Sequence, residues 1–299
     1  MKQFLRKLNR YKYPYLFLAP TIILLFVFSI IPIFAALGIS FTNMNLKGLA
    51  NFSNISFIGI GNYLALFKDD SFLQALYNTA FYVVIGVPLV IVFSLGIALL
   101  LNYGTSFIFR FARMLYYAPA ITNIVAVAVV WGYLYNNSYG LFNYILQIFG
   151  VSPIPWLLDA KWAKLSLILL AVWKAIGMNM LIFLAALKGI PKTYYEAAEI
   201  DGANRWQKLK SITLPLLSFS IFFVTITTLI GWIQFFEEPM VMTKGGPLNS
   251  TLSLALLIYQ NGFKNSNFGY AAAGSFVLFI IIMIATAIQF KLKKRTVEY

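Results

Sequence analysis

Few side chains in this sequence could do chemistry. It contains no His and no Cys, and its nine Asp and Glu residues fall in the polar segments between long apolar runs or in the C-terminal tail. Acid–base catalysis, nucleophilic catalysis and metal binding draw mainly on these residue types. The sequence therefore disfavours a hydrolytic or redox enzyme, and it predicts no catalytic residue, no metal site and no cofactor bound by this chain.

Lys174 lies well inside one of the apolar runs. An unpaired ammonium in the middle of a bilayer costs on the order of 2.5–3.5 kcal/mol, so this side chain must face a cavity, a charged partner or a route to the membrane surface. Other polar and aromatic side chains at similar depth could line a cavity suited to sugars, whose hydroxyls need hydrogen-bond partners and whose C–H faces stack on aromatic rings. Helix packing also accounts for each of them singly. The predicted pathway residues are Asn123, Trp131, Lys174, Asn179, Thr228, Trp232, Gln234 and Phe235.

Apolar helices must position these residues. Of the 299 residues, 61% are hydrophobic and only 11% are charged, and the mean hydropathy is +0.80. No water-soluble fold of this size buries so much apolar surface with so few charges, and each run exceeds the roughly 20 residues that cross a bilayer as a helix. We therefore predict an all-α integral membrane protein, with one transmembrane domain over residues 1–299 and a first helix that is an uncleaved anchor. The six predicted spans are residues 15–37, 76–101, 112–135, 163–187, 211–236 and 269–290.

The net charge of +14 is explained by the position of the basic residues. The two ends of the chain, together with the segments after the second and fourth runs, hold 16 of the 23 Lys and Arg residues, whereas the alternate segments hold six. The positive-inside rule then predicts that both termini and the segment after the fourth run are cytoplasmic. No nucleic-acid partner is needed to explain the charge.

The segment from Lys188 to Pro215 gathers charges, small residues and turn formers between two apolar runs. Pro191 should stop the preceding helix, and Thr193 with Glu196 three residues later has the spacing of a capping box, which predicts a short helix that begins there. Gly202 permits a sharp exit from that helix. The segment is either a solvated loop or a surface that another protein contacts.

From Glu196 to Pro215 the spacing E-A-A-x3-G-x9-I-x-L-P resembles the EAA loop of importer-type ABC transporter permeases. The T-x-G-G-P segment from Thr243 to Pro247 resembles that of the carbohydrate-uptake branch, which includes the maltose and glycerol-3-phosphate systems. The chain lacks the extra leading helices and the large outer domain of the maltose protein, so it is similar to the shorter six-span members. Further likenesses, which extend the resemblance over nearly the whole chain, are Phe57 to Tyr63, Trp173-Lys174 and Phe268 to Ala273.

The resemblance implies a multi-pass subunit of an importer in a bacterial or archaeal plasma membrane. It implies a cytoplasmic coupling helix within residues 188–210, between the fourth and fifth spans, which docks into a cleft of the ATP-hydrolysing subunit. The implied partners are a second, unlike permease subunit, two ATP-binding subunits that hold ATP and Mg²⁺, and an extracytoplasmic solute-binding protein. The chain itself has no G-x4-G-K-[ST] phosphate-binding loop. The implied coupling residues are Glu196, Ala197, Ala198, Asp201 and Gly202.

The resemblance also implies transport of a sugar or oligosaccharide by alternating access. An alternative in the same class is a phosphorylated polyol or another anion, for which Lys174 would be the counter-charge. An intramembrane enzyme or an ion-coupled carrier is disfavoured because the acidic residues lie outside the apolar runs. An ion channel would leave the EAA-like helix without a role.

Overall fold

The computed structural model describes residues 2–104 and 106–293, with side chains described for residues 13–104 and 106–292. Within these residues the chain is helical, and the isolated bridge between Thr42 and Phe57 is the β-pairing they contain. The all-α prediction is therefore confirmed. Several basic residues of the orientation prediction have side chains outside the described range, namely Lys2, Arg6, Lys7, Arg10, Lys12, Lys293, Lys294 and Arg295.

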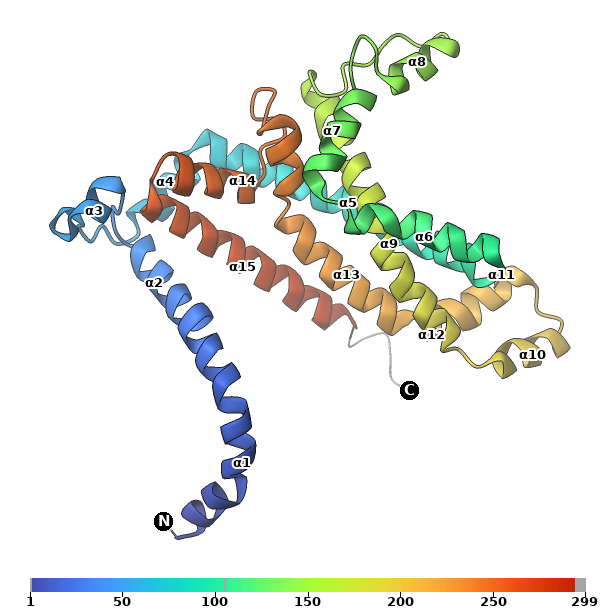
Figure 1. Ribbon diagram of the computed structural model, residues 1–299, viewed down its shortest axis with the longest axis horizontal. Coiled ribbons are helices and arrows are strands. Elements are labelled where there is room, and N and C mark those ends of the chain that lie inside the picture. The colour runs from blue at the N-terminus through green and yellow to red at the C-terminus, as the bar shows by residue number, and fades with distance from the viewer. Residues whose placement is uncertain (1, 105, 294–299) are drawn as a thin grey trace. The chain divides into compact units, whose positions relative to one another are not determined.

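Four of the predicted spans form continuous helical segments that are long and apolar enough to cross a membrane. The first, Tyr13–Ser40, runs through α1 (Lys2–Leu25), a π-helical turn at Phe26–Ile30 and α2 (Ile31–Ser40). The other three are α5 (Asp70–Asn102), α9 (Ala160–Lys188) and Phe268–Leu292 of α15 (Phe268–Lys293), all visible in Figure 1.

The remaining two predicted spans, 112–135 and 211–236, are broken helices, so the exact count of six transmembrane helices is not confirmed. The first consists of α6 (Phe107–Ile121) and α7 (Ile124–Leu134), which meet at 103°. Pro119 lacks a backbone donor in the last turn of α6, and the side chain of Asn123 accepts a hydrogen bond of 2.8 Å from the Val125 N–H at the start of α7. The missing donor of Pro119 and the cap by Asn123 therefore reduce the number of backbone N–H groups that the break leaves without a partner.

The second broken span bends by 64° at Leu217. On one side lie α11 (Arg205–Lys208), a π-helical turn at Leu209–Thr213 and α12 (Leu214–Leu216), and on the other lies α13 (Ser218–Ile233). A proline inside α12 removes a backbone donor just before the bend. The described residues thus contain four unbroken spans, or six if each bent pair is one span.

The chain divides into two compact units, of which the first comprises residues 1–67 and 258–276. Asn62 ties its segments together, because its side-chain amide donates hydrogen bonds of 2.8 Å to the carbonyl oxygens of Ser40 and Thr42. The N–H of Gly269 donates to the Met44 carbonyl at 2.9 Å. The shorter helical segments of this unit are α3 (Leu46–Ala50), Phe52–Asn54, Gln260–Lys264 and nearly all of α4 (Gly61–Lys68), whereas α14 (Leu254–Tyr259) begins in the second unit.

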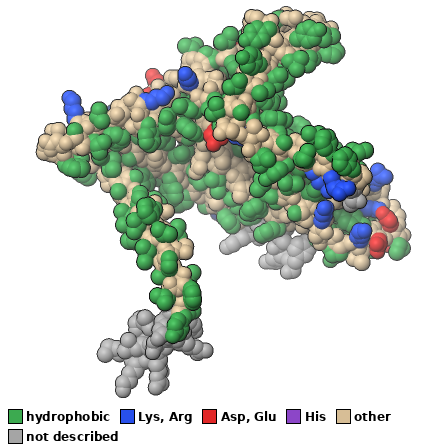
Figure 2. Space-filling view, in the orientation of Figure 1, with side chains coloured by type: hydrophobic (Ala, Val, Ile, Leu, Met, Phe, Trp, Pro, Cys, Tyr) green, Lys and Arg blue, Asp and Glu red, His purple; other side chains and the backbone are tan. Residues whose placement is uncertain are grey.

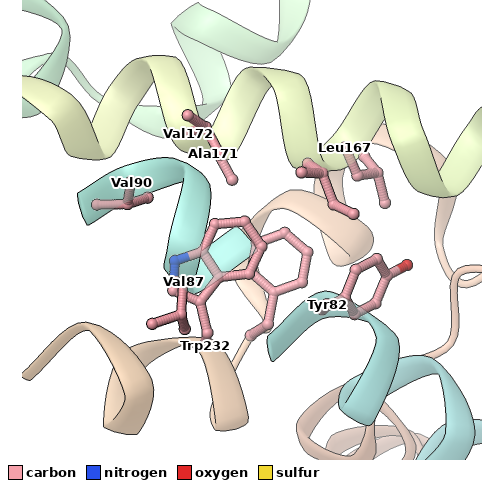
Figure 3. Close-up of a cluster of buried hydrophobic side chains, with 9 residues drawn as sticks. Tyr82, Val87, Val90, Leu167, Ala171, Val172 and Trp232 are labelled. Atoms are coloured by element: carbon pink, nitrogen blue, oxygen red, sulfur yellow. The ribbon is translucent and has the colours of Figure 1, made fainter. Parts of the chain in front are cut away.

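The second unit comprises residues 68–257 and 277–299, and its centre is a helix bundle. In it α9 packs against α5 and α6, and α13 packs against α5. The ring of Phe235, just after α13, packs edge-on against the ring of Tyr82 from α5, with centroids 4.8 Å apart, and so holds the end of α13 against α5. In lipid such contacts stabilise a bundle by close packing rather than by removal of apolar surface from water. A cluster of buried hydrophobic side chains fills the space between these helices. Figure 3 labels seven of its members: Tyr82, Val87 and Val90 from α5, Leu167, Ala171 and Val172 from α9, and Trp232 from α13.

The backbones of α6 and α9 approach each other closely at Gly177. A Cβ atom at this position would lie 2.8 Å from the Cα atom of Tyr117 and closer still to the carbonyl oxygen of Tyr116. Only a residue without a side chain fits there. Gly177 therefore fixes the distance between the two helices, and α9 carries Lys174, a predicted pathway residue, three residues earlier.

The segment between α7 and α9, which contains α8 (Leu141–Ile148), folds around Asn143. This buried side chain donates to the carbonyl oxygens of Asn137 and Ile154, at 3.2 and 3.0 Å. Its oxygen accepts from the Ile154 N–H and from the indole N–H of Trp156, both at 2.9 Å. One amide thus organises the whole connection.

Candidate functional site

A cavity of about 530 Å³ lies in the second unit between α9 and α13. Its size falls in the range of small-molecule binding sites. A short connection leads from the end of α13 to the π-helical turn at Pro239–Thr243. Five of the eight predicted pathway residues line it: Lys174, Asn179, Thr228, Trp232 and Phe235.

The other three predicted pathway residues lie elsewhere. Asn123 is exposed and caps the start of α7. Trp131 is buried among aromatic rings, with the centroid of Tyr135 at 5.3 Å and that of Trp173 at the same distance. Gln234 is exposed at the end of α13. Depth along an apolar run therefore predicted some residues of the cavity wall but not the side to which each helix turns.

The ammonium of Lys174 is paired with two carboxylates that follow α13. Its Nζ atom lies 3.1 Å from Oε2 of Glu237 and 3.9 Å from Oε1 of Glu238. The side chain of Glu238 is 10% exposed and lines the cavity, whereas that of Glu237 is 60% exposed. Burial raises the pKa of Glu238, and the charge of Lys174 acts against that shift.

Sequence reasoning placed Glu237 and Glu238 in a loop and did not pair them with Lys174. The signal that was available is physical, because a charged partner is one way to place a lysine within an apolar run, and this acidic pair begins at the residue directly after the predicted fifth span.

Neutral polar groups complete the cavity wall. The hydroxyl of Thr228 is buried and has no hydrogen-bond partner among the described residues. The Asn179 amide donates to the carbonyl of Ala175 at 2.9 Å, which fixes its orientation on α9. Trp232 and Phe235 supply aromatic surface. The wall thus offers hydrogen bonds, rings and one closed ion pair, an arrangement suited to binding a polar solute.

The second candidate region is α10 (Lys192–Ile200), a short helix that lies outside the apolar spans. The predicted capping box at Thr193 and Glu196 is wrong, because Pro191 occupies the N-cap position and no side-chain cap bond forms. The N-cap therefore lies two residues before the predicted one, and Thr193 lies inside the first turn of the helix. A true capping box stands instead at the start of α11, where Asn204 and Gln207 bond each other's backbone.

The exit from α10 follows the prediction for Gly202. This residue has φ = +74°, a left-handed conformation that favours glycine. The N–H of Gly202 donates to the Glu199 carbonyl at 3.0 Å, and the N–H of Ala203 donates to the Ala198 carbonyl at 2.8 Å. These two bonds form a Schellman motif, which ends the helix sharply.

Some side chains of α10 are bonded to the segment that follows the helix, and others are exposed. The carboxylate of Glu199 lies 2.6 Å from Nζ of Lys208, and this hydrogen bond lowers the pKa of Glu199. Tyr195 shares a hydrogen bond of 2.9 Å with the hydroxyl of Thr213. Ile200 is 88% exposed, and Figure 2 shows a group of charged side chains around α10 and α11. Of the predicted coupling residues, Ala198 is half-buried, whereas the exposed ones are Glu196, Ala197, Asp201 and Gly202.

The T-x-G-G-P segment packs onto α5. The hydroxyls of Thr243 and Thr251 lie 2.7 Å apart, and Thr251 also donates to the Gly246 carbonyl at 2.8 Å. From α5, the amide of Asn78 donates to the carbonyl oxygens of Asn249 and Leu252, at 2.9 and 2.8 Å. This anchoring fixes the turn that follows the acidic pair.

Comparison with known proteins gives consistent matches. Residues 57–298 match the family model described as binding-protein-dependent transport system inner membrane component. The lactose transport system permease protein LacF of Rhizobium radiobacter is 36% identical over 282 residues and covers 92% of both chains. The sn-glycerol-3-phosphate transport system permease protein UgpA of Agrobacterium fabrum (strain C58 / ATCC 33970) is 34% identical over 290 residues and covers 96% of both.

Two solved structures share the fold. A bacterial ABC transporter involved in the import of the acidic polysaccharide alginate has a TM-score of 0.82 at 23% identity, and the match covers 99% of this chain and 100% of that one. A bacterial alginate ABC transporter in complex with alginate pentasaccharide-bound periplasmic protein has a TM-score of 0.81 at 22% identity and covers 97% of this chain and 96% of that one.

Proposed function

This chain belongs to the family of binding-protein-dependent transport system inner membrane components, and from this membership we propose that it carries a sugar or an oligosaccharide through an ATP-driven importer. It is a multi-pass membrane permease of the ABC transporter class and not an enzyme. The observation that carries the sugar proposal is the cavity beside Lys174, where aromatic rings and hydrogen-bonding groups share one wall. Relatives named for lactose and glycerol-3-phosphate transport support it.

Transport would proceed by alternating access of this cavity. A solute with several hydroxyls can donate to the Glu238 carboxylate, accept from the Lys174 ammonium and contact the edges of the aromatic side chains in the wall. The permease supplies selective binding and a path. The energy comes from ATP and Mg²⁺ bound by separate ATPase subunits.

Coupling to those subunits is assigned to α10 on the cytoplasmic side. Three features support it: the E-A-A-x3-G spacing, the sharp glycine exit, and the exposure of most of the coupling residues. The bond between Glu199 and Lys208 ties α10 to α11, which leads through α12 toward α13. Movement of α10 would thereby reach the helix that bears Trp232.

The full assembly in this proposal has two unlike permease subunits, two ATPase subunits and an extracytoplasmic binding protein. The name of the family states dependence on a binding protein. The fold-matched alginate transporter has been solved with a periplasmic protein bound, which supports a comparable partner for this chain.

Purification of the complex from native membranes tests the proposal. The co-purified binding protein is titrated with lactose, maltose and cellobiose and, outside the sugar class, with glutamine and glycine. Binding of a sugar is expected, and binding of only an amino acid would refute the sugar assignment. Absence of any ATP-hydrolysing subunit from the complex would refute the importer itself.

Coupling is tested by Ala198→Trp, which places a large side chain at the half-buried position of α10. We expect solute uptake by proteoliposomes to fall about tenfold or more, because a displaced contact between α10 and the ATPase subunit transmits movement poorly. The amount of the variant inserted in the membrane should stay normal. The matched control is Ala50→Trp, at an exposed alanine in α3. Normal uptake by the Ala198 variant would disprove the coupling role.

A further inference from the structure

We propose that the cavity selects electrically neutral sugars and rejects anionic ones, because Lys174 is already neutralised by Glu237 and Glu238. The inference rests on the proposed function and names the substrate class of the same site. Family membership leaves this question open, because the relatives include permeases named for lactose, a neutral sugar, and for glycerol-3-phosphate, an anion.

The charges around the cavity carry the argument. Among the described lining residues, the ionisable ones are Lys174 and Glu238. Glu237 is not part of the lining, but its carboxylate lies 3.1 Å from the Lys174 ammonium. The three groups sum to −1 when all are ionised and to zero when Glu238 is protonated. In neither state does the cavity offer a net positive charge to an anion.

The geometry makes the ion pair costly to open. The Lys174 side chain is 19% exposed, and Glu238 is buried beside it. An anion that recruited the ammonium would leave a buried carboxylate without its cation, and breaking a buried pair in this way is strongly unfavourable. An additional negative charge roughly 5 Å from a net negative site lowers affinity by about tenfold or more.

A neutral sugar meets no such obstacle. Its hydroxyls can act as donors and acceptors at once, so it can bond to the carboxylate and the ammonium while their pair stays closed. The buried hydroxyl of Thr228, which has no partner among the described residues, is a further neutral group in the same wall. The pathway lysine therefore contributes a hydrogen-bond donor and not a counter-charge.

The first test is the ligand of the co-purified binding protein, titrated with galactose, galacturonate, glucose and glucuronate beside the disaccharides. Preference for the neutral member of each pair is expected. Preference for a uronate would overturn the charge inference and leave the sugar assignment standing, whereas binding of amino acids alone would remove both.

The second test addresses the cavity directly. The intact importer in nanodiscs, without binding protein, is titrated with galactose and galacturonate by saturation-transfer NMR. The wild type should prefer galactose, and the combined E237Q and E238Q substitutions, which free Lys174, should shift the affinity ratio toward galacturonate by about tenfold or more. D70N, which removes an exposed carboxylate at the start of α5 outside the cavity lining, is the matched control and should leave the ratio unchanged.

Co-purification of the ATPase subunits checks that each variant assembles. Equal binding of the two sugars by the wild type, no binding of galactose, or an unchanged ratio in the double variant would overturn the proposal.

Discussion

Replacement of Gly177 by alanine is expected to force α6 and α9 apart. The added methyl would lie 2.8 Å from the Cα atom of Tyr117, whereas ordinary contact begins at 3.4 Å. The backbones must therefore separate by at least 0.6 Å, the difference between these distances. The Tyr117 Cα atom and the Tyr116 carbonyl oxygen both belong to the backbone, so no side chain can move aside instead. Overpacking of this kind costs about 1–3 kcal/mol. The helix also gains about 0.5–1 kcal/mol from any Gly-to-Ala change.

Gly96 supplies the control that removes this second contribution. It lies inside α5, and a Cβ atom built there meets nothing within 4 Å. Gly96→Ala should stabilise the protein only by the gain in helix propensity. The difference in stability between the two alanine variants therefore isolates the cost of overpacking at Gly177. That difference of about 1–3 kcal/mol corresponds to about 2–10 °C in Tm.

The assay is thermal unfolding of the purified complex, followed by loss of monodisperse protein in detergent. Uptake should fall with stability in the Gly177 variant because α9 carries Lys174 and Asn179 to the cavity. Equal Tm values for the two alanine variants would refute the close approach of α6 and α9.

Three further outcomes are expected. Lys174→Met should reduce sugar uptake with normal membrane content by immunoblot, since it leaves a buried carboxylate without its cation; unchanged uptake would remove Lys174 from the pathway. Asn143→Ala should cost about 2–4 kcal/mol, since the Trp156 indole loses its acceptor, and the surrounding loop should become protease-sensitive at lower temperature. Because Lys208 lowers the pKa of Glu199, the stabilisation from their pair should be present above the ordinary value of 4.5 and be lost only as the pH falls below it. The ¹³C carboxyl shift of Glu199, assigned with E199Q, should titrate accordingly, and a midpoint above 4.5 would contradict the pairing.

Composition and run length predicted the helical class and four of the spans, because a helix is the simplest way to satisfy every backbone group in lipid. They could not predict the breaks at Asn123 and Leu217. A run stays equally apolar whether it is straight or bent, and the side-chain cap at Asn123 is visible only when its Val125 partner is placed.

The coupling segment shows the same division between local and tertiary information. Gly202 was predicted correctly because its left-handed conformation is a local property. Thr193 was misassigned because Pro191 already occupies the N-cap position, two residues earlier. The pairing of Lys174 with Glu237 joins residues 63 positions apart, and no periodicity within a helix reports such a contact.

The exposure of Ile200 has a consequence for the life of the protein in the cell. Ile200 is a nearly bare aliphatic side chain at the end of a helix outside the apolar spans, and together with neighbouring apolar groups such a side chain can contribute to an interaction surface for other proteins. Under the proposed coupling role, a subunit docked on α10 would cover this side chain, and copies made in excess of that subunit would keep it exposed to such proteins.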